Sequence, residues 1–253
     1  MMALLQVQGA TRRFGGLIAV DNVSMDIEAA EIVGVIGPNG AGKTTLFNLI
    51  SGFTPLSSGA IQFEDARIDG EKTFRIARRG VGRTFQNLRI FPNMSLFDNV
   101  SVGAVGMLGA GPLRALSRAS HASAEIAERT WHALERVGLA HEAHMLAANL
   151  SYGKRKYLEI ARALAMQPKL LILDEPAAGL NESETHALAH FIRQLHGEGL
   201  TVLLVEHNMA LVMSICQRIV VLASGRKIAD GPPEAVRADP LVLESYLGVE
   251  DEA

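Results

Sequence analysis

The chain has 253 residues, of which 48% are hydrophobic and 20% are charged, a composition typical of a globular α/β protein rather than a disordered or fibrous one. Its formal net charge of −3 argues against a basic surface of the kind that binds nucleic acid. The single cysteine, Cys216, cannot form an internal disulfide bond, so we expect a reducing compartment and a buried, unreactive thiol.

The first residues carry neither a basic segment nor a long apolar one, so the sequence does not predict a signal peptide. No stretch is long, apolar and uncharged enough to predict a membrane-spanning helix. The most apolar window, residues 200–223, contains Glu206, His207 and Arg218. We therefore expect a cytoplasmic protein that reaches a membrane only through a partner.

Weakly alternating apolar residues between positions 4 and 30 predict antiparallel strands with one solvated face, and residues 60–85 continue the same pattern. Between these segments, residues 32–36 form a short apolar run that predicts a buried parallel strand. Residues 45–50 are apolar enough to begin a buried helix.

Residues 37–45 connect that strand to that helix and fit the phosphate-loop pattern G-x-x-x-x-G-K-[ST]. Glycines let backbone N–H groups approach a phosphate, Lys43 supplies a positive charge, and the Thr44 hydroxyl can ligate Mg²⁺. A chance glycine-rich turn is the alternative, and the flanking strand and helix argue against it. We expect a nucleoside triphosphate to contact the whole loop, namely Gly37, Pro38, Asn39, Gly40, Ala41, Gly42, Lys43, Thr44 and Thr45.

Residues 95–165 are rich in alanine, leucine and glutamate, and the apolar spacing over 125–137 predicts a helix, whereas 106–112 is predicted to be a loop. Ser151 precedes a second helical pattern with Tyr157, Ile160, Ala161 and Leu164 on one face. Serine is a good N-cap, so this segment is either a capped helix alone or also an anion site offered to the nucleotide of another subunit.

From residue 168 onward strands alternate with helices: 170–173, 202–205 and 219–223 are predicted strands, 182–195 is a predicted helix, and a short helix is predicted near 241–247. Acidic residues follow the first of these strands. Asp174 is suited to hold Mg²⁺ through water, and Glu175 to act as a general base toward water. The alternative is a polar strand end with no chemistry.

Two further polar residues follow predicted strands. His207 comes after the strand at 202–205, where residues of a parallel sheet face the ligand crevice. Gln86 could ligate Mg²⁺ or position water, although a single glutamine is a weak signal.

In order and spacing these motifs resemble those of the ATP-binding cassette family over nearly the whole chain. Residues 37–45 match Walker A, Gln86 the Gln loop, 150–154 the signature segment, 170–175 Walker B, and His207 the switch histidine. Phe14 looks like the aromatic residue that stacks on adenine in this family. The resemblance implies an α/β P-loop NTPase with a RecA-like core, an antiparallel β subdomain and an inserted α-helical subdomain. It further implies one ATPase domain over 1–253, divided into a core (1–92 and 166–253) and a helical subdomain (93–165).

The resemblance also implies ATP and Mg²⁺ as ligands, with Glu175, His207 and Gln86 in catalysis and Thr44, Gln86 and Asp174 at the metal. Residues Ser151, Tyr152 and Gly153 would complete the nucleotide site of a second cassette subunit. Integral-membrane permease subunits would be partners, a periplasmic binding protein an indirect one, and nucleic acid none. The permease would contact the segment 87–97, and the protein would lie on the inner face of the cell membrane.

Three residues depart from the usual family pattern, namely Tyr152, Lys154 and Asn181, and together with the surrounding motifs they resemble the bacterial uptake ATPases for branched-chain amino acids. Relatives in that subgroup handle urea, amides and aromatic acids, so a related small substrate remains open. Two other functions also remain open. One is a soluble cassette ATPase in another role, and the other is the ATPase of a lipopolysaccharide-type exporter.

Overall fold

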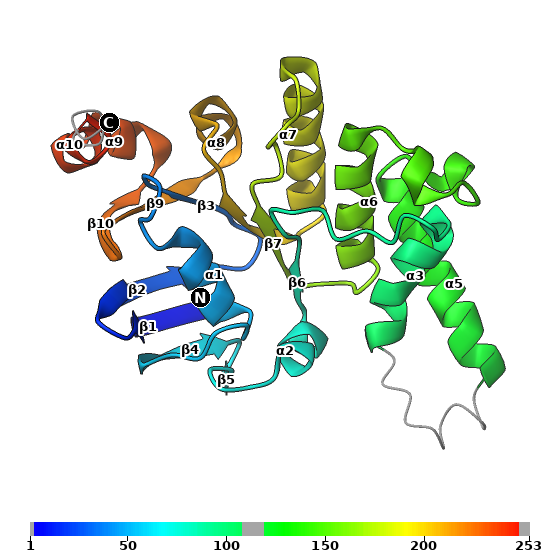
Figure 1. The fold of residues 1–253 in the computed structure, drawn as a ribbon, viewed down its shortest axis with the longest axis horizontal. Coiled ribbons are helices and arrows are strands. Elements are labelled where there is room, and N and C mark those ends of the chain that lie inside the picture. Colours follow the sequence, from blue (N-terminus) through cyan, green and yellow to red (C-terminus); the bar gives the residue numbers. More distant parts are fainter. Residues whose placement is uncertain (1–2, 108–118, 248–253) are drawn as a thin grey trace.

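The computed structural model describes residues 3–107 and 119–247, which form two sheets and several helices (Figure 1). The strands are β1 (Leu5–Phe14), β2 (Leu17–Ile27), β3 (Ile32–Ile36), β4 (Ser58–Phe63), β5 (Ala66–Arg67), β6 (Val81–Arg83), β7 (Leu170–Asp174), β8 (Thr201–Val205), β9 (Arg218–Ala223) and β10 (Arg226–Gly231). The α-helices are α1 (Lys43–Ile50), α2 (Thr73–Arg79), α3 (Leu96–Met107), α5 (Ala119–Arg136), α6 (Tyr152–Leu164), α7 (Glu182–Gly197), α8 (Met209–Ile215), α9 (Pro233–Ala238) and α10 (Pro240–Leu247).

The central sheet has the strand order β10-β9-β3-β8-β7-β6, and its neighbouring strands are parallel except for the pair β10–β9. Strands β3, β7 and β8 are buried along their whole length, which explains why their sequences are continuous apolar runs. The second sheet, β2-β1-β4-β5, is antiparallel. Its strands alternate buried and exposed residues, as predicted for a sheet with one solvated face.

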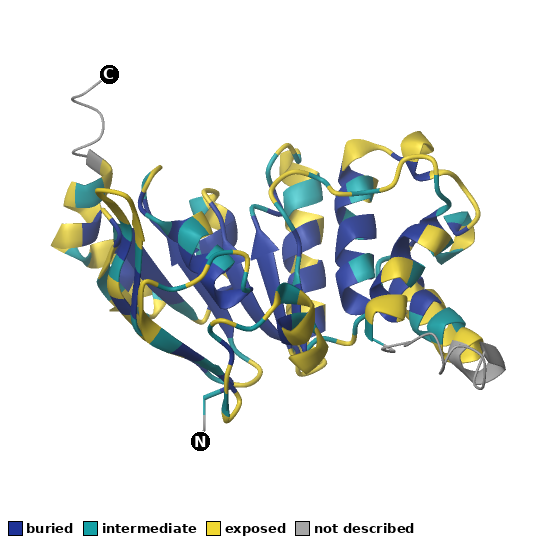
Figure 2. Ribbon diagram, turned by 60° about the horizontal axis from the view of Figure 1, so that its bottom comes forward, coloured by how far each residue is buried: buried dark blue, intermediate teal, exposed yellow. Residues whose placement is uncertain are grey.

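Both faces of the central sheet are covered, so successive side chains of one strand enter different cores. In β3, Ile32 and Ile36 pack among the helices, whereas Val33 and Val35 pack in the core shared with α1 and the antiparallel sheet. Figure 2 shows the buried strands running through the middle of the molecule. Because both faces are buried, polar loops can be accommodated only at the strand ends.

Helices α3, α5 and α6 pack against one another at the end of the molecule beyond α7 (Figure 1). The predicted helix at 125–137 is part of α5, and Ile160, Ala161 and Leu164 of the predicted apolar face of α6 are buried. We keep the division into a core (1–92 and 166–253) and a helical subdomain (93–165) as a prediction.

The antiparallel pattern predicted for residues 60–85 is wrong beyond β5. Thr73–Arg79 is helix α2, in which only Ile76 is buried, and Val81–Arg83 is the edge strand of the parallel sheet. Gly80, with φ 111°, ends α2 and separates the two elements, a break that apolar alternation does not detect.

The predicted loop at 106–112 is also corrected in part. Gly106 and Met107 belong to helix α3, while residues 108–112 lie outside the described residues. The strands predicted at 32–36, 170–173, 202–205 and 219–223 and the helices predicted at 182–195 and 241–247 are confirmed. Strand β10 and helices α8 and α9 were not predicted.

Two glycines of α3 provide a test of how tightly the helices pack. A Cβ on Gly103 would lie 2.1 Å from the carbonyl oxygen of Arg162 in α6, whereas a Cβ on Gly106 would meet open space. Gly103→Ala should therefore destabilise the protein by about 1–3 kcal/mol. For a chain of this size that lowers the melting temperature by roughly 2–10 °C. Thermal denaturation followed by circular dichroism would measure the shift.

Gly106→Ala is the matched control, because it introduces the same methyl group into the same helix without a neighbour. It should leave the melting temperature unchanged or raise it slightly, since alanine favours the helix over glycine. Equal melting temperatures for the two variants would contradict the close approach of α3 to α6.

Candidate functional site

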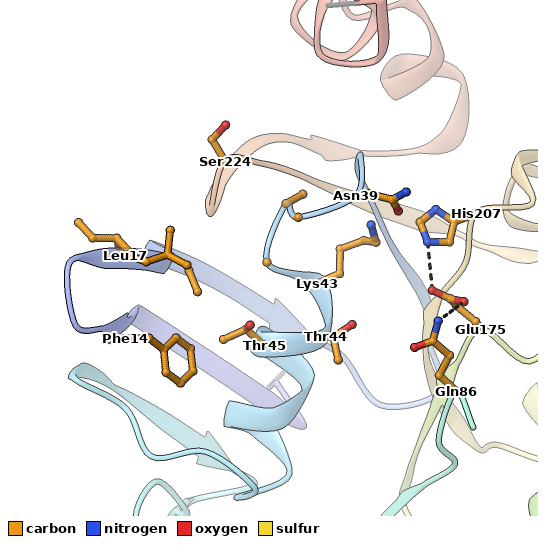
Figure 3. Close-up of a pocket in the computed structure, with 15 residues that line it drawn as sticks. Phe14, Leu17, Asn39, Lys43, Thr44, Thr45, Gln86, Glu175, His207 and Ser224 are labelled. Carbon is orange, nitrogen blue, oxygen red and sulfur yellow. Dashed lines mark hydrogen bonds and ion pairs between the residues drawn. The ribbon is translucent and has the colours of Figure 1, made fainter. Parts of the chain in front are cut away.

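A cleft of about 660 Å³ lies at the carboxyl ends of the parallel strands, a volume within the range of small-molecule sites. In Figure 3, Phe14 and Leu17 lie at one end, and Gln86, Glu175 and His207 lie at the other. The loop before α1 runs between them. The lining consists of Phe14, Leu17, Ile18, Ala19, Asn39, Gly40, Ala41, Gly42, Lys43, Thr44, Thr45, Gln86, Glu175, His207 and Ser224.

The loop between β3 and α1 is fixed by close backbone packing at its start. Gly37 has a φ of 148°, and a Cβ at this position would lie 2.0 Å from the carbonyl oxygen of Leu222 in β9. Only glycine fits there, so β9 sets the path of the loop. Helix α1 begins directly after the loop, and its unpaired N-terminal N–H groups are therefore available to an anion at this point.

Lys43 is buried within this loop, and its Nζ donates hydrogen bonds to the carbonyl oxygens of Gly37 (2.7 Å) and Pro38 (3.0 Å). Burial lowers the pKa of Lys43, and the carboxylates of Glu175 and Asp174 oppose that shift. The ammonium group is thus held by two neutral carbonyls. Because a phosphate carries full negative charge, it is a stronger partner for this ammonium than either carbonyl.

Glu175 joins the other two predicted catalytic residues. Its Oε2 accepts a hydrogen bond from Gln86 Nε2 at 2.9 Å, and its Oε1 lies 3.0 Å from His207 Nε2 (Figure 3). These residues follow β6, β7 and β8, three neighbouring strands of the sheet. The parallel topology therefore gathers, at one end of the cleft, side chains that are far apart in the sequence.

Asp174 is almost fully buried, and its Oδ2 accepts a hydrogen bond from Arg83 Nη2 at 2.9 Å. Arg83 also donates from Nη1 to Asn48 Oδ1 (2.8 Å) and Ser51 Oγ (2.6 Å) of the α1 region. Burial lowers the pKa of Arg83, and Asp174 opposes this. The sequence analysis did not assign a role to Arg83. The available signal was a charged residue directly after Val81 and Gly82.

Glu206 is a second residue that the sequence analysis did not assign. It is buried, its Oε1 accepts a hydrogen bond from the N–H of Ala177 at 2.6 Å, and its Oε2 accepts one from the N–H of His207 at 3.1 Å. Burial raises the pKa of Glu206, and these N–H groups oppose the shift. The carboxylate thereby ties the loop after β7 to the loop after β8.

The segment Ser151–Gly153 lies apart from the cleft, since none of the described residues that line the cleft comes from it. Ser151 is the predicted N-cap of α6, and its hydroxyl accepts a hydrogen bond from the N–H of Lys154 at 3.4 Å. Ser151 and Tyr152 are exposed, and Gly153 is buried beside Glu184. Within this single chain, the three residues therefore form no part of the cleft wall.

The departure at position 181 has a local explanation. Asn181 is the N-cap of α7: its side chain accepts a hydrogen bond from the N–H of Glu184 at 2.9 Å, and the Glu184 carboxylate accepts one from the N–H of Asn181 at 3.0 Å. This is a capping box, which asparagine forms as well as aspartate.

Phe14, by contrast, is 47% exposed and lines the cleft, so it is not a core residue. The guanidinium carbon of Arg12 lies 4.4 Å from the centre of its ring. Cys216 is buried, and this raises the pKa of its thiol to about 12, as expected of an unreactive cysteine. Among the described helices, none is long and apolar enough to cross a membrane.

Comparison with known proteins identifies the family. A family model described as ABC transporter matches residues 20–178, and a model of the branched-chain amino acid ATP-binding cassette transporter matches residues 226–252. The chain is 45% identical over 249 residues to the high-affinity branched-chain amino acid transport ATP-binding protein LivG of Salmonella typhimurium, covering 97% of this chain and 98% of that one. It is equally similar to BraF of Pseudomonas aeruginosa and 37% identical to a probable LivG of Archaeoglobus fulgidus over 99% of this chain and 97% of that one.

Solved structures agree with these matches. The ADP conformation of an ATP-binding cassette from an ABC transporter superposes with a TM-score of 0.86 at 31% identity, covering 98% of this chain and 100% of that one. A nucleotide-free cassette superposes with a TM-score of 0.85 at 30% identity, covering 97% and 99%. The chain therefore belongs to the ABC transporter family, as one of its ATP-binding, ATP-hydrolysing cassettes.

Proposed function

We propose that this chain is the ATP-hydrolysing subunit of a membrane importer for branched-chain amino acids or related small amino acids and amides. The placement of Glu175 carries the hydrolytic part of the proposal, because its carboxylate is held between Gln86 and His207 at the end of the phosphate-loop cleft. The substrate class is supported by relatives that are named as branched-chain amino acid transport proteins and that match this chain over nearly their whole length. The names of these relatives also favour import over a soluble role or over a lipopolysaccharide-type exporter.

The cleft suits ATP bound in one orientation. The exposed ring of Phe14 offers a face on which adenine can stack, and the backbone from Asn39 to Thr45 offers N–H groups to the phosphates. Lys43 would exchange its carbonyl partners for the β and γ phosphates. Since Phe14 and Glu175 line opposite ends of the cleft, the terminal phosphate would lie beside Glu175 (Figure 3).

Mg²⁺ fits the donor set at the phosphate end. Thr44 and Gln86 line the cleft and offer a hydroxyl and an amide oxygen, and Asp174 offers a carboxylate that is shared with Arg83. In the described parts of the chain, no group of three histidine, cysteine or acidic residues could hold a metal by itself. An incomplete oxygen shell is what Mg²⁺ accepts, because phosphates and water complete it. When bound, the ion would neutralise charge on the phosphates.

Hydrolysis would use water activated by Glu175. The carboxylate accepts a proton as the water oxygen attacks the γ-phosphorus, and the bond to the ADP oxygen breaks. Gln86 and His207 each contact one carboxylate oxygen, so together they restrict rotation of the base. This arrangement positions the base before the substrate arrives.

The exposed Ser151 and Tyr152, with Gly153, would face the nucleotide of a second cassette, either an identical chain or a sister subunit. Closure of two subunits on ATP would drive permease subunits, supplied with substrate by a periplasmic binding protein, at the inner face of the membrane. In the segment proposed to contact the permease, Ile90 and Phe97 pack on the core, whereas Phe91 is 45% exposed. Phe91 is therefore the stronger candidate for that contact.

Replacing the proposed base tests the hydrolytic role. Glu175→Gln keeps the shape of the side chain but removes the proton acceptor, and a positioned base contributes roughly 10²- to 10⁴-fold in rate. Steady-state phosphate release should fall by that factor while ATP still binds. A variant within threefold of the parent would remove Glu175 from this role.

Nucleotide binding should depend on both ends of the cleft. Mg-ATP at about 100 times its Kd should stabilise the Glu175→Gln protein by about 2.7 kcal/mol. For a chain of this size, that raises the melting temperature by roughly 5–10 °C. Adding Lys43→Ala should abolish most of the shift, and adding Phe14→Ala should weaken ATP binding by roughly 1–3 kcal/mol.

The control for Phe14→Ala is the protein without nucleotide. Because the ring is half exposed, its removal should leave the apo melting temperature almost unchanged, and Phe14→Tyr should retain ATP affinity. A large apo destabilisation with unchanged affinity would show that the ring packs rather than binds.

The substrate class can be tested by uptake measurements in the organism that encodes this protein. Chromosomal replacement of Glu175 by Gln should abolish high-affinity uptake of radiolabelled leucine, isoleucine or valine, and a plasmid copy of the parent gene should restore it. Normal uptake of all three, with loss of urea or amide uptake, would keep the ATPase role and reassign the substrate.

A further inference from the structure

Helix α6 carries two buried charged residues on the side that faces the core. Lys156 is 4% exposed and Glu159 is 3% exposed, and residues three apart lie on the same face of a helix. Buried charges are costly unless they are paired or hydrogen-bonded. Their contacts therefore indicate what this face of the helix holds in place.

Each of the two residues contacts the backbone of a catalytic loop. Lys156 Nζ donates a hydrogen bond to the carbonyl oxygen of Glu175 at 3.1 Å. Glu159 Oε1 accepts one from the N–H of Arg89, which follows Gln86 by three residues, at 3.4 Å. Burial raises the pKa of Glu159, and the nearby Arg162 opposes the shift. One helix face thus contacts both the loop that carries Glu175 and the loop that carries Gln86.

The main chain at Glu175 needs such support. Its φ is 49°, in the left-handed region that non-glycine residues rarely adopt and that persists only where neighbours enforce it. The N–H of Glu175 donates to the carbonyl of Val205 in β8 at 2.9 Å. On the other side, the carbonyl oxygen of Glu175 accepts hydrogen bonds from Lys156 Nζ at 3.1 Å and from the N–H of Ala178 at 3.2 Å. Without Lys156, the Ala178 N–H is the remaining described donor to this carbonyl, so the peptide that follows Glu175 would tilt more easily. The carboxylate would then shift relative to Gln86 and His207.

We propose that Lys156 is a positioning residue through which helix α6 sets the orientation of Glu175 in its own chain. The inference rests on the proposed roles of Glu175 and of the 151–153 segment. The N-terminus of α6 is the part that would face the nucleotide of the second subunit, and Lys156 lies little more than one turn further along the same helix. A shift of α6 on nucleotide capture would therefore move the catalytic carboxylate, and each subunit's hydrolysis would respond to the nucleotide that its signature segment binds.

Replacing Lys156 by Met in the full chain tests this. Methionine keeps much of the apolar stem and removes the donor. We expect kcat for ATP to fall about 10- to 100-fold, the size of effect that small misplacement of a catalytic group produces. The Kd for ATP should stay within twofold and the apo melting temperature within about 3 °C, whereas Lys156→Arg, which keeps a donor, should recover most of the rate.

Lys169→Met is the matched control, because the Lys169 side chain is exposed and pairs with Glu64 outside the cleft. It should leave kcat unchanged. A Lys156→Met protein with kcat within threefold of the parent would overturn the inference. A Lys156→Met protein whose ATP affinity or stability falls by as large a factor as its kcat would also overturn the inference.

The double variant that combines Lys156→Met with Glu175→Gln shows whether Lys156 positions Glu175 or has a general structural role. If Lys156 acts through Glu175, adding Lys156→Met to Glu175→Gln should change the residual phosphate release, measured with excess enzyme and radiolabelled ATP, by less than twofold. A further loss as large as that in the parent background would overturn the inference. Full activity of Glu175→Gln alone would instead overturn the proposed base, and with it this role of Lys156.

Discussion

The site depends on one constraint, the complete burial of the parallel strands β3, β7 and β8. Buried on both faces, these strands can place polar groups only at their ends, and parallel strands end at the same edge of the sheet. The phosphate loop, Glu175 and His207 each follow one of them. The apolar core and the chemistry are therefore products of the same topology.

Around this edge the protein buries several charged side chains, and each has at least one hydrogen-bond partner, although Arg83 Nε itself has none among the described residues. Asp174 and Arg83 pair with each other, Glu206 accepts backbone N–H groups, and Lys43 donates to loop carbonyls. Such groups contribute little net stability, because desolvation offsets their attraction. Breaking one of them is costly, so they restrict the loops to one arrangement. That restriction is what a preorganised site requires.

Sequence patterns predicted the parts of the site that are local. The phosphate loop follows β3, Asp174 and Glu175 lie at the end of β7, and His207 follows β8, so each lies close to an apolar strand. The spacing of these motifs carried the family resemblance. Arg83, Glu206 and Lys156 escaped prediction because their roles arise from contacts between distant segments. The error over residues 60–85 has a similar origin. Helix α2 and strand β6 are too short to show a period, and β6 joins the parallel sheet through pairing with β7, which lies far along the chain.

The contact between Tyr152 and Gly179 restricts how related sequences can vary. An added Cβ on Gly179 would lie 2.8 Å from an edge carbon of the Tyr152 ring, so the aromatic residue in the signature segment already fills the space that a side chain in the following loop would need. Gly179 also has a φ of 80°, in the left-handed region that favours glycine whatever space lies beside it. The backbone conformation and the Tyr152 ring therefore both hold this position to glycine, and a smaller residue at 152 would relieve only the second constraint.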